Sequence, residues 1–146
     1  MKVLLITVKS QVSKGGIASW TEGFLDGCKK NGVEIDIVNT EVIGDRLNNL
    51  TSGRSFFDEY KRTTRILSDL RKMLKRKTTY DVVHLNTSCG TFGIIRDLLI
   101  ARYIKKKNIP LVTHYHCDIP YWIKRFYSKW VLTRLAKLSK KKYCTV

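Results

Sequence analysis

Short apolar runs alternate with helical patterns along this chain, and this alternation constrains the fold more than any other feature. The apolar runs lie at residues 3–8, 33–38, 82–85, 111–114 and 143–146. Runs of this length are typical of parallel strands that helices cover on both faces. Amphipathic segments separate them, as in βαβ crossover units. The sequence therefore predicts one α/β domain built on an open, doubly wound parallel sheet.

The segments between the runs predict four helices and one loop. Apolar residues at helical spacing begin at Ile17, and Asn31-Gly32 is a typical helix end. Three further helices are expected. The first, at 56–77, is amphipathic with a Lys/Arg face, the second ends near 107–108, and the third is a long helix after Pro120. Residues 40–55 lack periodicity and are expected to form a loop.

The net charge of +16 indicates an affinity for phosphate-rich partners, which could be nucleic acid, an anionic membrane or a phosphorylated substrate. No helix-turn-helix, RRM or zinc pattern is present, so nucleic acid is the less favoured partner. After Asp118 the sequence contains no acidic residue. Aromatic residues crowd the same helix, where core packing is the default interpretation. They are Tyr121, Trp122, Phe126, Tyr127 and Trp130. A membrane-surface helix and an ordinary solvated basic face are equal alternatives for this region.

The cysteines and the first residues bear on localisation. The four cysteines, at 28, 89, 117 and 144, form no CxxC pair. The apolar start MKVLLITV is short and lacks a cleavage site, and no stretch is long enough to span a bilayer. We expect a cytoplasmic protein with free thiols, which could also lie peripherally at the inner face of the membrane.

Three segments follow predicted strands and should meet at one edge of the sheet, because ligands of such sheets gather beyond the carboxyl ends of the strands. They are Lys14-Gly15-Gly16, Asn86-Thr87-Ser88 and the segment from His114 to Asp118. Glycines before a helix let backbone N–H groups approach a phosphate. Gly15-Gly16 matches neither GxGxxG nor the P-loop, so a tight turn without a ligand remains an equal alternative.

The histidines and Asp118 also allow two interpretations each. His84 lies inside a strand and could be a core histidine or a functional one. His114 and His116 should share one strand face, with His116 nearer the rim. A His-x-His pair could bind a metal, but no third ligand is evident and no metal is expected. Asp118 could accept a hydrogen bond from a sugar hydroxyl or cap the following helix.

Four pieces, read in order, carry a family resemblance. They are Lys14-Gly15-Gly16-Ile17-Ala18, then residues 31–35, then residues 80–86 and finally residues 110–116. Their order and spacing resemble the N-terminal domain of GT4-type retaining glycosyltransferases, over essentially the whole chain. The resemblance implies a Rossmann-like domain that forms a single half of a two-domain GT-B fold. The chain is similar to bacterial enzymes that build cell-surface polysaccharides or glycolipids.

The resemblance implies transfer of a hexose from a nucleotide-sugar donor to a glycan or lipid-linked acceptor, without a cofactor. It places Gly15 and Gly16 near the donor diphosphate, and His116 near the reacting sugar as the catalytic residue. The remaining rim residues are then expected near the acceptor or the sugar. These are Lys14, Asn86, Thr87, Ser88 and Asp118.

The resemblance also implies that a C-terminal domain supplies most of the donor contacts. Residues 1–146 would then be an N-terminal domain truncated before its C-terminal partner, and inactive alone. The alternative is a basic, non-enzymatic α/β module that binds a membrane or nucleic acid.

Overall fold

The computed structural model describes residues 1–9, 15–41, 56–75, 79–87 and 90–139. It contains a four-stranded parallel sheet with the order β2-β1-β3-β4. The strands are β1 (Lys2–Thr7), β2 (Glu34–Asn39), β3 (Val82–Thr87) and β4 (Leu111–Tyr115). These strands match four of the five predicted runs to within two residues. The fifth run, 143–146, and most of the predicted loop lie outside the described residues.

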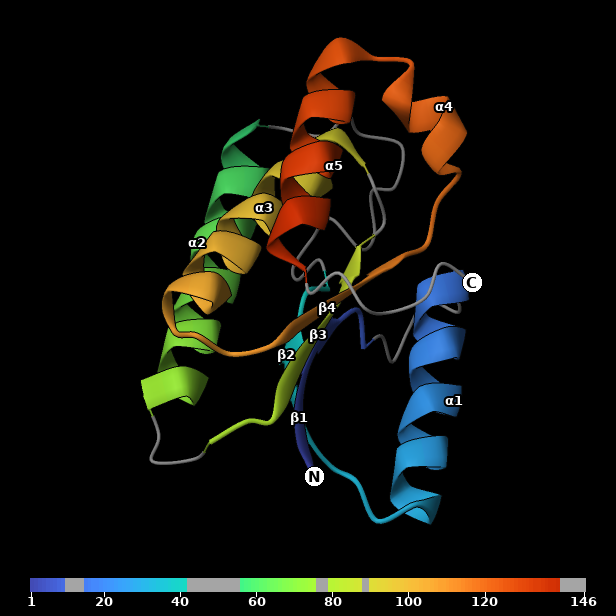
Figure 1. The fold of residues 1–146 in the computed structure, drawn as a ribbon, viewed down its shortest axis with the longest axis vertical. Helices are drawn as coiled ribbons and strands as arrows, with labels where there is room; N and C mark the ends of the chain where they lie inside the picture. The colour runs from blue at the N-terminus through green and yellow to red at the C-terminus, as the bar shows by residue number, and fades with distance from the viewer. Residues whose placement is uncertain (10–14, 42–55, 76–78, 88–89, 140–146) are drawn as a thin grey trace.

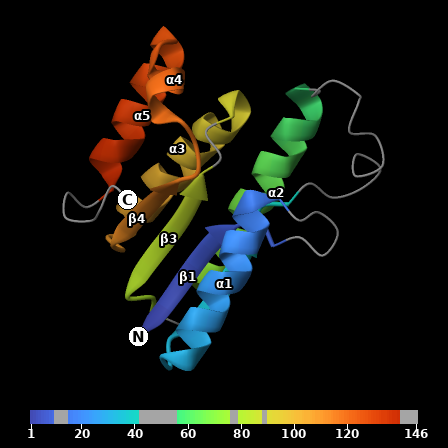
Figure 2. The ribbon, with the colours of Figure 1, turned by 90° about the vertical axis from the view of Figure 1, so that its right-hand side faces the viewer.

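Helices cover both faces of the sheet, which confirms the doubly wound α/β prediction. The helix α1 (Gly16–Lys30) lies on one face, and α2 (Phe56–Lys75), α3 (Thr91–Lys106) and α5 (Phe126–Leu138) lie on the other (Figures 1 and 2). The α1 helix ends as predicted, because Asn31 caps it and Gly32 follows with a φ of 66°. That left-handed conformation favours glycine.

The main hydrophobic core lies between the sheet and the face covered by three helices. Alternation along β1 sends Leu4 and Ile6 into this core, whereas Leu5 and Thr7 point toward α1. The helices contribute fully buried aliphatic side chains that stack against the strands. They include Ile66 and Leu70 of α2, Ile94, Ile100 and Ile104 of α3, and Leu135 of α5.

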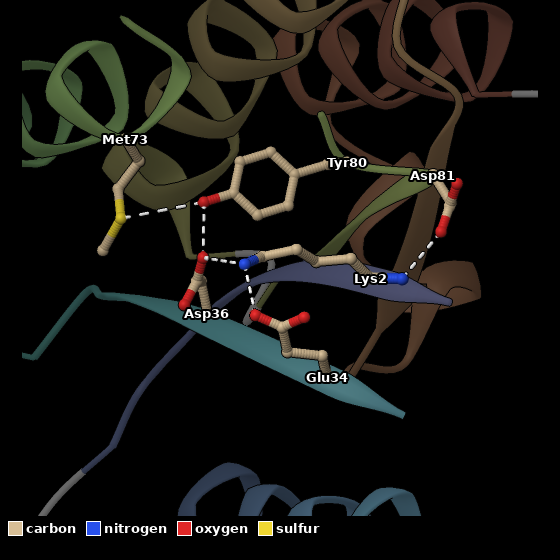
Figure 3. Close-up of polar contacts among 6 residues, drawn as sticks. All are labelled: Lys2, Glu34, Asp36, Met73, Tyr80 and Asp81. Atoms are coloured by element: carbon tan, nitrogen blue, oxygen red, sulfur yellow. Dashed lines mark hydrogen bonds and ion pairs between the residues drawn. The ribbon is translucent and has the colours of Figure 1, made fainter. Parts of the chain in front are cut away.

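Polar contacts at the amino ends of the strands tie β1 to its two neighbours (Figure 3). The Lys2 ammonium group pairs with Glu34 and lies 3.4 Å from Oδ2 of Asp36, both on β2. The backbone N–H of Lys2 donates to Oδ2 of Asp81 at 2.7 Å, just before β3. The Tyr80 hydroxyl donates to Oδ2 of Asp36 at 2.7 Å. These contacts fasten the edge opposite the predicted ligand rim.

The third strand is longer than predicted, because Asn86 and Thr87 belong to β3 and not to a turn. Both have partners on β4, where Asn86 pairs with His114 and Thr87 with Tyr115. The Thr87 carbonyl also accepts from the His116 N–H at 2.9 Å. Pairing with β4 continues through these polar residues, whereas the pairing with β1 ends at Leu85, so polarity alone misplaced the end of the strand.

The predicted long helix after Pro120 is wrong, because the structure contains two helices there. The short α4 (Ile119–Ile123) ends before Arg125, whose φ of −92° and ψ of 124° are extended, and α5 then begins. Figure 1 shows α4 turned away from α5 at the carboxyl end of the sheet. The break lets α5 lay Val131 and Leu135 against the core, which a straight continuation of α4 would not reach.

Candidate functional site

A small network of polar side chains lies at the carboxyl ends of the central strands, beneath α1. The amide nitrogen of Asn86 on β3 donates to the Thr7 hydroxyl at the end of β1 at 3.0 Å. That hydroxyl lies 2.7 Å from the hydroxyl of Thr21 on α1, which donates to the Ile17 carbonyl at 2.7 Å. The Oδ1 atom of Asn86 is buried and has no hydrogen-bond partner among the described residues. The network therefore retains one unused acceptor.

Gly15 and Gly16 lie at the start of α1, above the same rim. Gly15 caps the helix with φ −77° and ψ 159°, and its carbonyl accepts from the Ser19 N–H at 3.1 Å. A Cβ atom added to either glycine would meet no heavy atom within 4 Å. The same holds for Gly23 and Gly27 within α1, so this space does not separate a phosphate site from a turn without a ligand.

The three histidines of the chain gather around one tryptophan, Trp20 of α1. The Trp20 ring makes edge contacts with His84, His114 and His116, at centroid distances of 5.5, 4.7 and 5.2 Å. The His114 and His116 rings lie 4.0 Å apart. Phe24 stacks on Trp20 at 4.8 Å and contacts His84 edge-on at 5.1 Å. We call these five residues the histidine–tryptophan cluster.

The cluster keeps its imidazoles neutral. Burial lowers the pKa of His84 to about 4, with His114 and His116 adding a smaller repulsion. Burial also lowers the pKa of His114, and burial followed by the charge of His114 lowers the pKa of His116. The Nε2 atoms of His84 and His116 are buried without a hydrogen-bond partner among the described residues. A neutral imidazole can donate one hydrogen bond and accept another.

The structure separates the predicted site residues into three groups. Asn86 and His116 lie on the α1 face of neighbouring strands, near the helix that Gly15 and Gly16 begin. Thr87 is fully buried and, by strand alternation, points to the face opposite α1, away from Asn86 and His116. Lys14 and Ser88 lie outside the described residues.

Asp118 acts as a helix cap in this structure. Its Oδ1 accepts from the Tyr121 N–H at 3.3 Å, at the first turn of α4. The capping interpretation is therefore confirmed, and it accounts for this carboxylate without a sugar.

Two contributors to the rim were missed in the sequence. Thr7 and Thr21 look like ordinary strand and helix residues, and only the fold places their hydroxyls beside Asn86. Trp20 lies at helical spacing after Ile17, but that spacing does not show that it contacts all three histidines. Contacts between residues so far apart in sequence leave no local signal.

Part of the predicted Lys/Arg face of α2 makes hydrogen bonds within the fold. Arg62 donates through Nε to the Thr40 carbonyl at 2.9 Å, and Arg65 donates to the Glu41 carbonyl at 2.6 Å. Burial, with repulsion from Arg96, lowers the pKa of Arg62 to about 10. These two arginines anchor the segment after β2 and are not part of a solvated basic face.

The aromatic residues of α4 and α5 are mostly exposed, so the expectation of core packing is wrong for four of them. Tyr121, Phe126, Tyr127 and Trp130 expose between 40% and 87% of their surface, with Phe126 the most exposed. The core side of α5 is made instead by its aliphatic residues. We call these four side chains the aromatic surface. Exposed basic residues accompany it, namely Lys124, Arg125, Lys129, Arg134 and Lys137.

The cysteine expectation holds only in part. Cys28 is a free thiol, whereas Cys117 is disulfide-bonded, so thiols are not free throughout. Within the described ranges, no three His, Cys, Asp or Glu side chains are arranged to hold a metal ion. None of the helices described is long and apolar enough to cross a membrane.

Residues 14–145 match the family model described as Glycosyltransferase Family 4. No curated protein matches the chain.

Proposed function

The chain belongs to glycosyltransferase family 4, and from this membership we propose that it forms the acceptor side of a sugar-transfer site. The donor would be a nucleotide sugar, and the acceptor a growing polysaccharide or a glycolipid. The observation that carries the proposal is the convergence of Gly15-Gly16, Asn86 and His116 on the α1 face of one sheet edge.

Each of these groups suits one part of the transfer chemistry. The N–H groups at the start of α1 and the helix dipole favour the negative charge of the donor diphosphate. The unused Oδ1 of Asn86 can accept from a sugar hydroxyl. Neutral His116 can donate to the sugar or to the departing phosphate, where negative charge develops. A ligand would have to displace the side chains that cover these two buried atoms.

We propose that this rim does not transfer sugar by itself. Transfer requires the donor to be positioned and its leaving diphosphate to be stabilised at the same time. The groups above contact only one side of such a donor. A second, donor-binding domain would supply the opposite side, either on a longer protein or on a separate chain.

The aromatic surface supports a further proposed partner, an anionic membrane that presents a lipid-linked acceptor. Exposed Phe126 and Trp130 could enter the headgroup region, while neighbouring lysines and arginines contact anionic lipids. The helix α4 and the start of α5, which carry these residues, lie at the end of the molecule where the strands of the sheet terminate (Figure 1). Membrane docking there would bring the acceptor close to the proposed site.

Donor binding can be tested directly on this chain. Uniformly ¹⁵N-labelled protein is titrated with UDP-glucose, GDP-mannose and ADP-glucose, and backbone amide shifts are mapped. We expect the largest shifts at Gly15, Gly16 and Ile17 for the matching nucleotide. Gly16→Asp, which places a carboxylate where the diphosphate should lie, should abolish them, and Gly23→Asp on the same helix serves as the control. Shifts confined to the opposite sheet edge would contradict the proposal.

A further inference from the structure

The histidine–tryptophan cluster points to a role for Trp20, a residue that the proposed function does not include. We propose that Trp20 is a positioning residue for His116, because its indole holds the imidazole in one orientation and excludes water from Nε2. The inference rests on the proposed function for the role of His116, but the contact itself can be tested without any substrate.

The geometry around His116 carries this inference. Its ring contacts two aromatic neighbours, His114 at 4.0 Å and Trp20 at 5.2 Å, which also contact each other at 4.7 Å. The Trp20 contact is edge-on, with an interplanar angle of 70°. Edge contacts of this kind between aromatic rings are favourable and direction-dependent. His116 follows the last residue of β4, and its backbone N–H still donates to the Thr87 carbonyl of β3 at 2.9 Å. That bond fixes the backbone at His116, whereas the contact with the indole constrains the side chain.

Trp20 is itself well anchored. Phe24 stacks against it one turn later at 4.8 Å, and the next residue, Thr21, is fixed to Thr7 on β1. Trp20 also lies one turn after the proposed phosphate-binding residue Gly16. The same helix thus begins at the donor diphosphate and carries the side chain that orients the histidine. This arrangement couples the two parts of the proposed site through one rigid element.

The charges around the imidazole favour its neutral form. From β4, His114 repels a charge on His116, and from β3, His84 contacts His114 and the same indole. From α1, the uncharged Trp20 and Phe24 contact the histidine rings. Among the described residues, no carboxylate contributes to the pKa shifts of these three rings. Removing the indole should admit water and relieve the desolvation that opposes protonation.

The test is an NMR titration of the His116 imidazole in the 146-residue chain, assigned with His116→Asn. In the wild-type protein we expect a midpoint below the ordinary value of about 6.5. Trp20→Ala should move the midpoint up toward that value and speed exchange of the ring N–H with water, and Trp20→Phe should do so less. Trp130→Ala, which removes an exposed indole on α5, is the matched control and should change neither.

Trp20→Leu, which keeps apolar volume, replaces Trp20→Ala if the alanine variant does not fold by circular dichroism. An unchanged His116 midpoint in either folded variant overturns the proposal. A second reading uses a protein in which Trp20 is the only tryptophan, after Trp122→Phe and Trp130→Phe. Its fluorescence should fall as His116 becomes protonated, since an imidazolium quenches a neighbouring indole, and part of that fall should vanish with His116→Asn. A pH-independent emission would also overturn the proposal.

These outcomes are separate from those of the proposed function. A shifted His116 midpoint without any donor binding would support the contact between Trp20 and His116 but contradict its role in sugar transfer. Donor binding with an unshifted His116 midpoint would support the proposed donor site but contradict the positioning role of Trp20. Where transfer is measurable, the pH dependence of kcat/KM in Trp20→Phe should follow the NMR midpoint of His116.

Discussion

At the scale of single residues, the buried imidazoles link the site to stability. His84 contacts the stacked rings of Trp20 and Phe24 edge-on. Burial lowers its pKa to about 4, well below the value near 6.5 of an unfolded chain. The unfolded state therefore takes up protons first as the pH falls. The contribution of neutral His84 to the free energy of unfolding is fully present above pH 6.5 and is lost progressively between pH 6.5 and pH 4.

This linkage predicts an acid-sensitive fold. Between pH 7 and pH 5, the free energy of unfolding should fall by up to about 2 kcal/mol through His84 alone. Urea denaturation followed by circular dichroism at both pH values measures the change. In His84→Gln, which cannot be protonated, the fall should be correspondingly smaller. An equal pH dependence in both proteins would show that His84 does not carry the effect.

His116 supports a second prediction at this scale, for any assembly that transfers sugar. His116→Ala should lower kcat by about a hundredfold, because one hydrogen-bond donor to the developing charge is lost. Steady-state kinetics, with circular dichroism to confirm folding, measure this. Asp118→Asn keeps a capping side chain on α4 and should leave kcat nearly unchanged. Near-normal kcat in His116→Ala would remove this residue from the site.

At the scale of elements, polar contacts at one sheet edge hold the strands whose other ends form the site. Tyr80 connects α2 to β2, because its buried hydroxyl donates to Asp36 and also lies 3.9 Å from the Met73 sulfur (Figure 3). The Lys2 ammonium group shares the same Asp36 carboxylate. The edge is therefore a connected network, and losing one member leaves others incompletely paired.

Tyr80→Phe should lower the free energy of unfolding by about 1–2 kcal/mol, since a hydrogen bond to a carboxylate is removed. Urea denaturation at pH 7 measures the difference. Tyr60→Phe removes the hydroxyl of a tyrosine that is 59% exposed and should cost nothing detectable. If both variants were equally stable, the network at this edge would contribute little.

At the scale of the whole molecule, charge and exposed aromatic surface occur together. The net charge is +16, and the α4–α5 region combines exposed aromatic rings with basic residues and no acid after Asp118. Each basic residue near an anionic surface contributes roughly 1 kcal/mol, within a Debye length of about 8 Å in physiological salt. The rings would add an apolar contribution that salt does not screen.

We therefore predict salt-sensitive binding to anionic vesicles, measured by co-sedimentation in low and moderate salt. The double variant Phe126→Ser and Trp130→Ser keeps every charge and should bind markedly less, whereas Phe57→Ser on α2 should behave like the wild type. Equal indifference to anionic and neutral vesicles would eliminate the membrane partner. A parallel duplex-DNA titration checks the alternative, because purely electrostatic DNA binding should weaken steeply with salt.

The proposed division of the site predicts that the purified 146-residue chain gives no useful sugar transfer. Product formation from labelled nucleotide sugars and a lipid-linked acceptor measures this. Adding a donor-binding domain should be necessary for turnover, since the leaving diphosphate needs stabilising groups on both sides. Robust turnover by the chain alone would contradict the proposal.

Much of the architecture could be predicted from the sequence because local patterns carry it. Apolar runs such as Leu4–Ile6 and the Asn31-Gly32 helix end report burial and backbone conformation directly, so four strands and their crossover helices were found. The rim was also predictable, because parallel strands end at a common edge. Gly15, Gly16, Asn86 and His116 were placed there by that rule alone.

Only the tertiary structure decided which of those residues face a ligand and what surrounds them. Pairing with β4 extended β3 and directed Thr87 to the face opposite α1. The predicted long helix is broken before α5, which packs aliphatic residues against the core and leaves Phe126 exposed. Trp20 met three histidines from β3 and β4 or just beyond it. The physical reason is the same in each case: strand pairing and side-chain contacts join residues distant in sequence, and no local pattern records which partners will meet.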